Sequence, residues 1–171
     1  LIVEDDLGLQ GQMRWCFGEE TEVVVATTAD EAVAAVRRHQ PQVVTLDLGL
    51  PPEPGGSAEG FRALAEVLAL APATKVVVIT GREEHDHAVR AIAGGAFDFY
   101  QKPVQADTLT FVVDRAFRIR GLEEENARLS RQARTPLEGL IASSDAMLKI
   151  CRTIEKVGPT SVSVLVRGET G

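Results

Sequence analysis

The sequence predicts a doubly wound α/β domain, in which helices cover both faces of a parallel sheet. The first observation is a set of short runs, rich in Val and Ile, that are apolar at nearly every position, as in parallel strands buried on both faces. The second observation is that a helical pattern follows each run in strict alternation, which indicates strand–helix units. The predicted strands are residues 1–3, 22–26, 42–46, 75–80 and 97–100.

Each segment that follows a predicted strand carries an apolar face at helical spacing. The second of these segments also begins with a capping box, because Thr28 is followed three residues later by Glu31. Gly94 and Gly95 can end the fourth. In chain order, the five faces contain Leu9, Met13, Cys16 and Phe17; Ala32, Val33 and Val36; Phe61, Leu64 and Leu68; Val89 and Ile92; and Leu109, Val112, Val113 and Ala116.

The composition limits the classes of function. The 171 residues carry a formal net charge of -7, so a broad basic surface for nucleic acid is not expected on this chain. No apolar run is long enough to span a bilayer, so no membrane partner is expected. Cys16 and Cys151 are far apart, which favours free thiols in a reducing cytoplasm over a disulfide framework.

A single long helix is predicted from about residue 105 to 134, interrupted only by Gly121. Its second part carries apolar residues at alternating spacings of three and four with charges between them, which is typical of a coiled-coil seam. A lone exposed helix with this stripe would be unstable, so we expect a homodimer; the alternative is a solvated helix extension without a partner. The predicted seam consists of Ile119, Leu122, Asn126, Leu129 and Ala133, with Asn126 as a polar residue that sets the register.

Polar side chains stand at the carboxyl ends of four predicted strands. Because the strands are parallel, these ends lie along one edge of the sheet, where ligands of such folds bind. The converging carboxylates repel one another and raise each other's pKa values, so a cation is needed to offset their charge. Mg²⁺ fits this need, because it binds a few carboxylates and completes its coordination shell with water and phosphate oxygens. The residues are the acidic run 4–6 with Asp5 and Asp6, then Asp47, then Thr80 with Gly81, and finally Lys102 with Pro103.

Such a pocket suits phosphoryl transfer. A carboxylate can act as a nucleophile toward a phosphoryl group, while Mg²⁺ and a lysine neutralise the charge on its oxygens. Asp47 is the best candidate for the nucleophile because it stands alone on the central strand. Asp5 and Asp6 would be the acids on the metal side, and the backbone carbonyl of Gly49 a further ligand. Thr80 could hydrogen-bond the transferred group.

Each of these residues alone also has an ordinary structural explanation. Asp5 and Asp6 could simply favour a helix N-terminus through its dipole, and Thr80 with Gly81 could form a turn. Lys102 could be a surface residue. The full set, in the right order on the right strand ends, favours the functional interpretation.

The runs "LIVEDD", "VTLDLGLP", "VVVITG" and "GAFDFYQKP" together resemble the receiver domain of bacterial response regulators, over residues 1 to about 117. The resemblance implies a flavodoxin-like fold of five strand–helix units with strand order 2-1-3-4-5. It implies that Asp47 accepts a phosphoryl group from a histidine kinase. It also implies that Asp6 and Asp47 bind Mg²⁺ directly, with Asp5 acting through water and Gly49 through its carbonyl.

The same resemblance assigns the remaining pocket residues. Thr80 and Lys102 would contact the phosphoryl group, and Thr80 with Phe99 would form the conformational switch. Tyr100 is less suited to that role, since neighbouring residues on a strand face opposite ways. The peptide bond before Pro103 is expected to be cis. Beyond self-catalysed phosphotransfer and autodephosphorylation, no enzymatic activity is expected.

Residues 118–134 would be a coiled-coil signalling linker, and residues 135–171 resemble the start of the AAA+ domain of NtrC-like, sigma-54-dependent activators. A helix with Met147, Ile150 and Ile154 and a strand over 161–168 are predicted there. The run Gly168, Glu169, Thr170 and Gly171 matches the first half of a P-loop, so ATP is expected only in a longer protein, with sigma-54 RNA polymerase and DNA as partners. The runs "TLDLGLPPEPGG", "DFYQKP" and "CRTIEKV" are most similar to the PrsR-type regulators of PEP-CTERM systems.

Two features depart from the usual receiver pattern. The loop that follows Asp47 is a few residues longer than is common, and Gly49 and Arg82 occupy the positions that flank the path of attacking water. Two other functions are considered. The first is a phosphatase of the haloacid dehalogenase type. Such an enzyme would need a second Asp at the position of Gly49, so the sequence gives this hypothesis little support. A receiver that is never phosphorylated, and only dimerises, is the second alternative.

Overall fold

The computed structural model describes residues 1–18, 21–52, 56–81, 85–133, 144–161, 163–165, 167 and 168; of residues 85 and 131–133 it describes the backbone alone. The chain divides into two compact units, Leu1–Glu123 and Glu124–Gly171. Arg82 and part of the loop after Asp47 lie outside the described residues, as do Glu169, Thr170 and Gly171 of the predicted P-loop.

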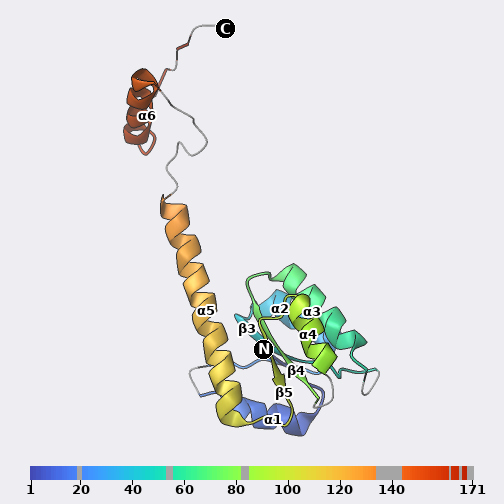
Figure 1. Cartoon of the computed structure of the whole chain (residues 1–171). Helices are drawn as coiled ribbons and strands as arrows, with labels where there is room; N and C mark the ends of the chain where they lie inside the picture. The colour runs from blue at the N-terminus through green and yellow to red at the C-terminus, as the bar shows by residue number, and fades with distance from the viewer. Residues whose placement is uncertain are drawn as a thin grey trace. The chain divides into compact units, whose positions relative to one another are not determined.

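The first unit is built on a five-stranded parallel sheet (Figure 1). The order β2-β1-β3-β4-β5 confirms the predicted doubly wound, flavodoxin-like topology. The central β3 pairs over its whole length with β4, from Val43 opposite Lys75 to Asp47 opposite Ile79. The strands are β1 (Ile2–Val3), β2 (Val25–Ala26), β3 (Val43–Asp47), β4 (Lys75–Thr80) and β5 (Asp98–Gln101).

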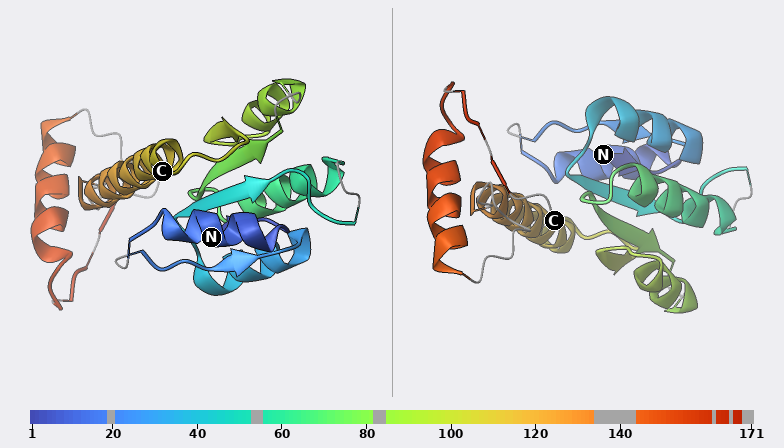
Figure 2. Two further views of the ribbon diagram at one scale, coloured as in Figure 1. Left: turned by 90° about the horizontal axis from the view of Figure 1, so that it is seen from below. Right: turned by 90° about the horizontal axis from the view of Figure 1, so that it is seen from above.

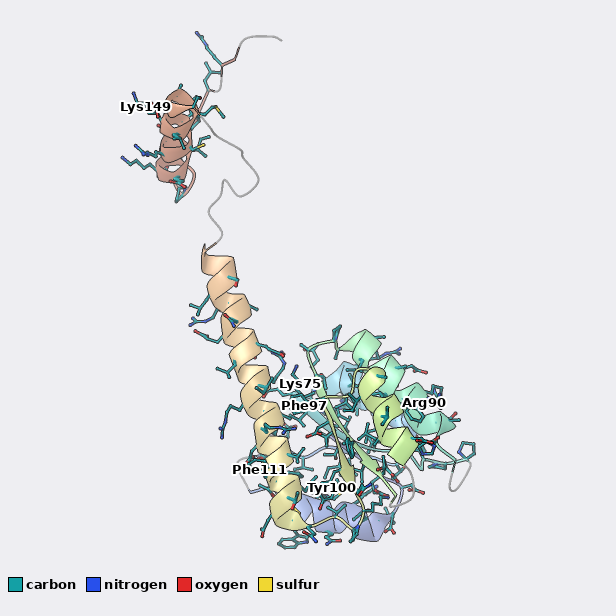
Figure 3. The ribbon with its side chains drawn as sticks, in the orientation of Figure 1. Lys75, Arg90, Phe97, Tyr100, Phe111 and Lys149 are labelled. Atoms are coloured by element: carbon teal, nitrogen blue, oxygen red, sulfur yellow. The ribbon has the colours of Figure 1, made fainter. Side chains whose placement is uncertain are left out.

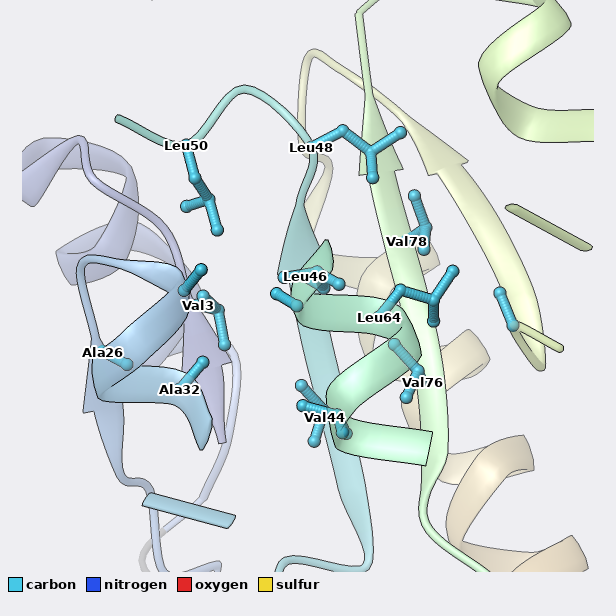
Figure 4. Close-up of a cluster of buried hydrophobic side chains, with 14 of the residues drawn as sticks. Val3, Ala26, Ala32, Val44, Leu46, Leu48, Leu50, Leu64, Val76 and Val78 are labelled. Carbon is cyan, nitrogen blue, oxygen red and sulfur yellow. The ribbon is translucent and has the colours of Figure 1, made fainter. Parts of the chain in front are cut away.

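Helices pack on both faces of this sheet (Figure 2). One buried cluster joins the sheet to α2, α3 and α4, and includes Val3, Leu46, Leu48 and Leu64 (Figure 4). The other joins the opposite face to α1 and the first part of α5, and includes Met13 and Leu109. The helices are α1 (Leu7–Trp15), α2 (Ala29–His39), α3 (Ala58–Leu70), α4 (His85–Ala93), α5 (Ala106–Ala133) and, in the second unit, α6 (Asp145–Val157).

The capping box predicted for α2 is confirmed in its first half. Thr28 Oγ1 accepts a hydrogen bond of 3.2 Å from the Glu31 amide, which satisfies one of the free donors of the first turn. The Glu31 carboxylate, however, accepts from the amide and hydroxyl of Thr27, both at 2.7 Å, one residue earlier than a standard box.

The prediction for the face of α4 is wrong. Val89 and Ile92 are 60% and 43% exposed, whereas Ala88 and Ala91 are fully buried. The small side chains therefore face the sheet, where they let the helix lie close to it. Periodicity alone favoured the larger residues, which on this helix point to solvent.

The long helix is confirmed as one uninterrupted element, and Gly121 does not break it. Within the single chain, Ile119 is half-buried, and Leu122, Asn126 and Leu129 are exposed, while the side chain of Ala133 lies outside the described part. Near its start the helix packs on the sheet through Leu109, Val112, Val113 and Ala116, as predicted. No helix among the described residues is long and apolar enough to cross a bilayer.

The second unit contains α6, and this helix includes Met147, Ile150 and Ile154, as predicted. Ser144 caps it by accepting a hydrogen bond of 3.3 Å from the Met147 amide. The strand predicted over 161–168 is absent from its described residues. A strand needs a neighbour for its backbone hydrogen bonds, and an apolar run cannot supply one by itself.

Candidate functional site

The carboxyl ends of the strands bring the polar residues together at one edge of the sheet. Asp47 is the last residue of β3, and Thr80 is the last residue of β4. Glu4 directly follows β1, and Lys102 directly follows β5. The parallel pairing places these ends side by side, so the predicted convergence is confirmed for Asp47 and Lys102, whose side chains touch.

Three carboxylates form a group that could hold a metal ion. Glu4, Asp5 and Asp47 each offer one oxygen, and these oxygens lie within 4.8 Å of one another. Glu4 and Asp47 are buried, with 1% and 6% of their surfaces exposed, whereas Asp5 is open to solvent. The group thus has two fixed acids at its base and one at its mouth.

Asp6 is not part of this group, which corrects its assignment as a direct metal ligand. It precedes the first residue of α1, and its Oδ1 accepts hydrogen bonds of 2.7 and 3.1 Å from the amides of Gly8 and Leu9. These bonds satisfy free donors at the start of the helix, as an N-cap Asp commonly does. The acid pair of the site is therefore Glu4 and Asp5, one residue earlier than expected.

Lys102 is the cation of the pocket. Its Nζ lies 2.9 Å from Asp47 Oδ2 and 3.1 Å from Glu4 Oε2. Burial opposes the charged form, but the hydrogen bond and the charge of Asp47, with those of Glu4, raise the pKa of Lys102 above its ordinary value. The ammonium therefore stays protonated between the two buried acids. The peptide bond between Lys102 and Pro103 is cis, as expected.

Among the residues that the structure describes, the negative charge of the pocket exceeds what the Lys102 ammonium can balance. Burial, followed by the nearby charge of Asp47, raises the pKa of Glu4 to about 7. Among the residues described, Glu4 Oε2 is buried and accepts no hydrogen bond of good geometry, although the Lys102 ammonium is near. All-oxygen donors with surplus negative charge and an open side fit a divalent cation such as Mg²⁺.

A buried glutamine supports the backbone of Glu4, and no motif in the sequence identifies it. Gln10 on α1 donates its side-chain amide to the backbone carbonyl of Glu4 and is itself only 8% exposed. The sequence carries a weak signal for this role, because Gln10 stands next to the apolar residue Leu9 at the inner side of the first helix. A polar residue that points inward needs a partner.

The two predicted switch residues differ in their surroundings. Thr80 is 1% exposed, and its Oγ1 has no hydrogen-bond partner among the described residues. Phe99 is 36% exposed on β5 and so points away from the buried cluster. Tyr100, like Phe97, packs against the buried cluster on the face of the sheet that α5 covers (Figure 3), and its hydroxyl accepts a hydrogen bond of 3.0 Å from the Gln105 amide. Tyr100 therefore has a structural role on that face.

Gly49 lies directly beside the Asp47 carboxylate. A Cβ on Gly49 would be 3.5 Å from Asp47 Oδ2, so the missing side chain leaves that oxygen uncovered on one side. A haloacid dehalogenase-type phosphatase requires a second acid two residues after its nucleophile. This chain has Gly49 at that position.

Comparison with known proteins agrees with this geometry. Residues 1–114 match the response regulator receiver domain family. The alginate biosynthesis transcriptional regulatory protein AlgB of Pseudomonas putida is 31% identical in an alignment of 172 positions that covers 100% of this chain and 37% of that protein. The C4-dicarboxylate transport transcriptional regulatory protein DctD of Rhizobium meliloti is 33% identical in an alignment of 174 positions that covers 99% of this chain and 36% of that protein.

A solved structure shows the same similarity. The crystal structure of NtrX from Brucella abortus is 34% identical, superposes with a TM-score of 0.69, and covers 93% of this chain and 34% of its own. This chain therefore spans just over a third of the length of these three proteins. Over residues 1–114, the chain belongs to the response regulator receiver domain family.

Proposed function

We propose that this chain accepts a phosphoryl group on Asp47 from a histidine kinase and thereby switches a sigma-54-dependent transcription activator. The observation that carries the proposal is the pocket itself. Asp47 is nearly buried, its Oδ2 lies 2.9 Å from the Lys102 ammonium, and Glu4 and Asp5 complete a group of oxygens suited to Mg²⁺.

The pocket supports transfer to a carboxylate oxygen. An Asp47 oxygen would attack the phosphorus atom of a phosphohistidine, and the bond between phosphorus and the imidazole nitrogen would break, with its electron pair left on the nitrogen. Lys102 would hold negative charge on the phosphoryl oxygens. Bound Mg²⁺, held by Glu4, Asp5, Asp47 and the carbonyl of Gly49, would supply the remaining positive charge.

Thr80 and Phe99 would convert this local charge into a change of conformation. The Thr80 hydroxyl is buried and lacks a partner among the described residues, so a phosphoryl oxygen beside it would provide one. Movement of Thr80 toward Asp47 would leave room for the half-exposed Phe99 ring to turn inward. β4 and β5 carry these residues as neighbouring strands, so the change would reach the surface of β5 and α4.

In a longer protein, α5 would carry the change to a homodimer and to a following AAA+ domain. Exposed Leu122 and Leu129 on α5 support the dimer, since an apolar stripe on a lone helix is unfavourable in water. ATP, sigma-54 RNA polymerase and DNA would be ligands and partners of that longer protein in the cytoplasm. The relatives named as transcriptional regulatory proteins support this assignment, and the three sequence runs noted above favour the PrsR type among them.

Replacing the phosphoacceptor should abolish phosphorylation without unfolding the domain. After incubation with acetyl phosphate and Mg²⁺, the intact mass of the wild-type chain should increase by one phosphoryl group, and that of Asp47→Asn should not. Asp107→Asn, which changes an exposed aspartate at the start of α5, is the matched control and should label normally. Labelling of Asp47→Asn would place the nucleophile elsewhere, and an unlabelled wild type would favour a receiver that only dimerises.

Mg²⁺ should stabilise the domain more strongly above neutral pH than below it. The folded-state pKa of Glu4 is about 7 and its ordinary value is 4.5, so the folded protein binds this proton more tightly and, without metal, loses stability as the pH rises between these values. Mg²⁺ binds the ionised form, so it should raise the melting temperature more at about pH 8 than at about pH 5.5. Glu4→Gln should reduce this pH dependence, whereas the exposed Glu155→Gln should retain it. Equal increases at both pH values would contradict the assignment of Glu4.

The seam on α5 predicts a dimer that depends on two leucines. Replacing Leu122 and Leu129 by Ala should lower the average mass in solution, measured by sedimentation equilibrium, because both side chains would lie in the interface. Leu70→Ala, at the end of α3, removes a leucine of similar exposure and should leave the mass unchanged. An unchanged mass for the double variant would exclude this seam as the interface.

A further inference from the structure

Gly60 packs unusually close to the backbone that follows Asp47. It is the third residue of α3, and a Cβ built on it would lie 2.4 Å from the Leu48 Cα, 2.6 Å from its carbonyl oxygen and 2.9 Å from its carbonyl carbon. All three neighbours are backbone atoms, so no side-chain rotation could relieve the overlap. Only a residue without a side chain allows this contact.

α3 is not free to move away from Leu48. Its inner face is fully packed, because Ala63, Leu64 and Val67 are buried in the cluster between α3 and the sheet (Figure 4). Its outer face is tied to α2, since Arg62 lies 2.9 Å from the Asp30 carboxylate. Interiors packed in this way resist displacement of a whole helix.

Leu48 is held from the other side. Its side chain is 1% exposed in the same cluster, and its amide donates a hydrogen bond of 3.3 Å to the Ile79 carbonyl of β4. Leu48 stands between Asp47, whose carboxylate belongs to the pocket, and Gly49, whose carbonyl is the proposed further ligand. A displacement at Leu48 would therefore move both of these groups.

We propose that Gly60 is a positioning residue of the acidic pocket, where its missing side chain sets the place of the Asp47 carboxylate and the Gly49 carbonyl for a divalent cation. The expected effect of Gly60 on phosphorylation rests on the proposed function. The expected effect of Gly60 on metal binding does not. Gly60 lies thirteen residues after Asp47, beyond the long loop, so the fold and not the sequence spacing brings it to the site.

Two other helical glycines offer a matched comparison. A Cβ on Gly121 of α5 would meet nothing within 4 Å, and the same holds for Gly11 of α1. At such open positions, exchange of Gly for Ala stabilises a helix. Gly60→Ala should have the opposite effect, since the same methyl group overlaps Leu48.

The test measures Mg²⁺ affinity by calorimetry and the rate of labelling with acetyl phosphate in the 171-residue chain. Gly60→Ala should weaken Mg²⁺ binding by about 10- to 100-fold, the loss typical of disturbed supports around a metal site, and should slow labelling. Gly121→Ala should match the wild type in both. Val67→Ala, which destabilises the same helix without pressing on Leu48, should lose melting temperature but retain Mg²⁺ affinity.

Two results would overturn the proposal. One is wild-type Mg²⁺ affinity in a folded Gly60→Ala variant, and the other is an equal loss in Val67→Ala, which would indicate general destabilisation. If Gly60→Ala does not fold, NMR of the wild type decides: the amide resonance of Gly60 should shift during Mg²⁺ titration with the same midpoint as those of Leu48 and Gly49, and a static Gly60 resonance would contradict the coupling. Failure of the wild type to label would count against the proposed function only, since Mg²⁺ affinity is measured independently.

Discussion

The site depends on one ammonium that lies between two buried carboxylates. Lys102 is within 3.1 Å of both Asp47 and Glu4, and neither acid is accessible enough for water to compensate its charge. Within the described part of the chain, the Lys102 ammonium cannot neutralise both of these acids and Asp5 as well. Burial, followed by the nearby charge of Asp47, raises the pKa of Glu4. A divalent cation would offset the surplus negative charge, and together with Lys102 it would then supply the positive charge that a phosphoryl group on Asp47 needs. Both the proposed chemistry and the proposed switch follow from this balance of charge.

The rest of the first unit places these groups. Parallel pairing puts the ends of β1, β3, β4 and β5 along one edge, and the two helical layers bury the sheet. Gln10 supports the backbone at Glu4 from one side, and Gly60 allows α3 to support the backbone after Asp47 from the other. At this edge the buried hydroxyl of Thr80 has no hydrogen-bond partner among the described residues, so it is available to respond to a new oxygen.

The parallel strands and the long helix could be predicted from continuous apolar runs and helical spacing, whereas the strand order followed from the resemblance to receiver domains. The convergence of Asp47 and Lys102 could be predicted from their places at the ends of strands. The assignment of Asp6 could not, since three acids in a row fit either a metal site or a helix cap until the start of α1 is known. Ala91 faces the sheet, and Ile92 does not. The close packing of α4 on the sheet selects the small residue, and the spacing of apolar residues in the sequence does not report how closely a helix packs. Gly60 was missed because its contact with Leu48 exists only in three dimensions.

The most direct test of this account is an NMR titration of the Glu4 side-chain carboxyl carbon, with Glu4→Gln used to assign the signal. Without metal, the account predicts a pKa of about 7 for Glu4, and Mg²⁺ should lower it because the cation favours the ionised carboxylate. An ordinary pKa near the model-compound value of 4.5, unchanged by Mg²⁺, would contradict the account, because Glu4 would then lie outside any charge-crowded metal pocket.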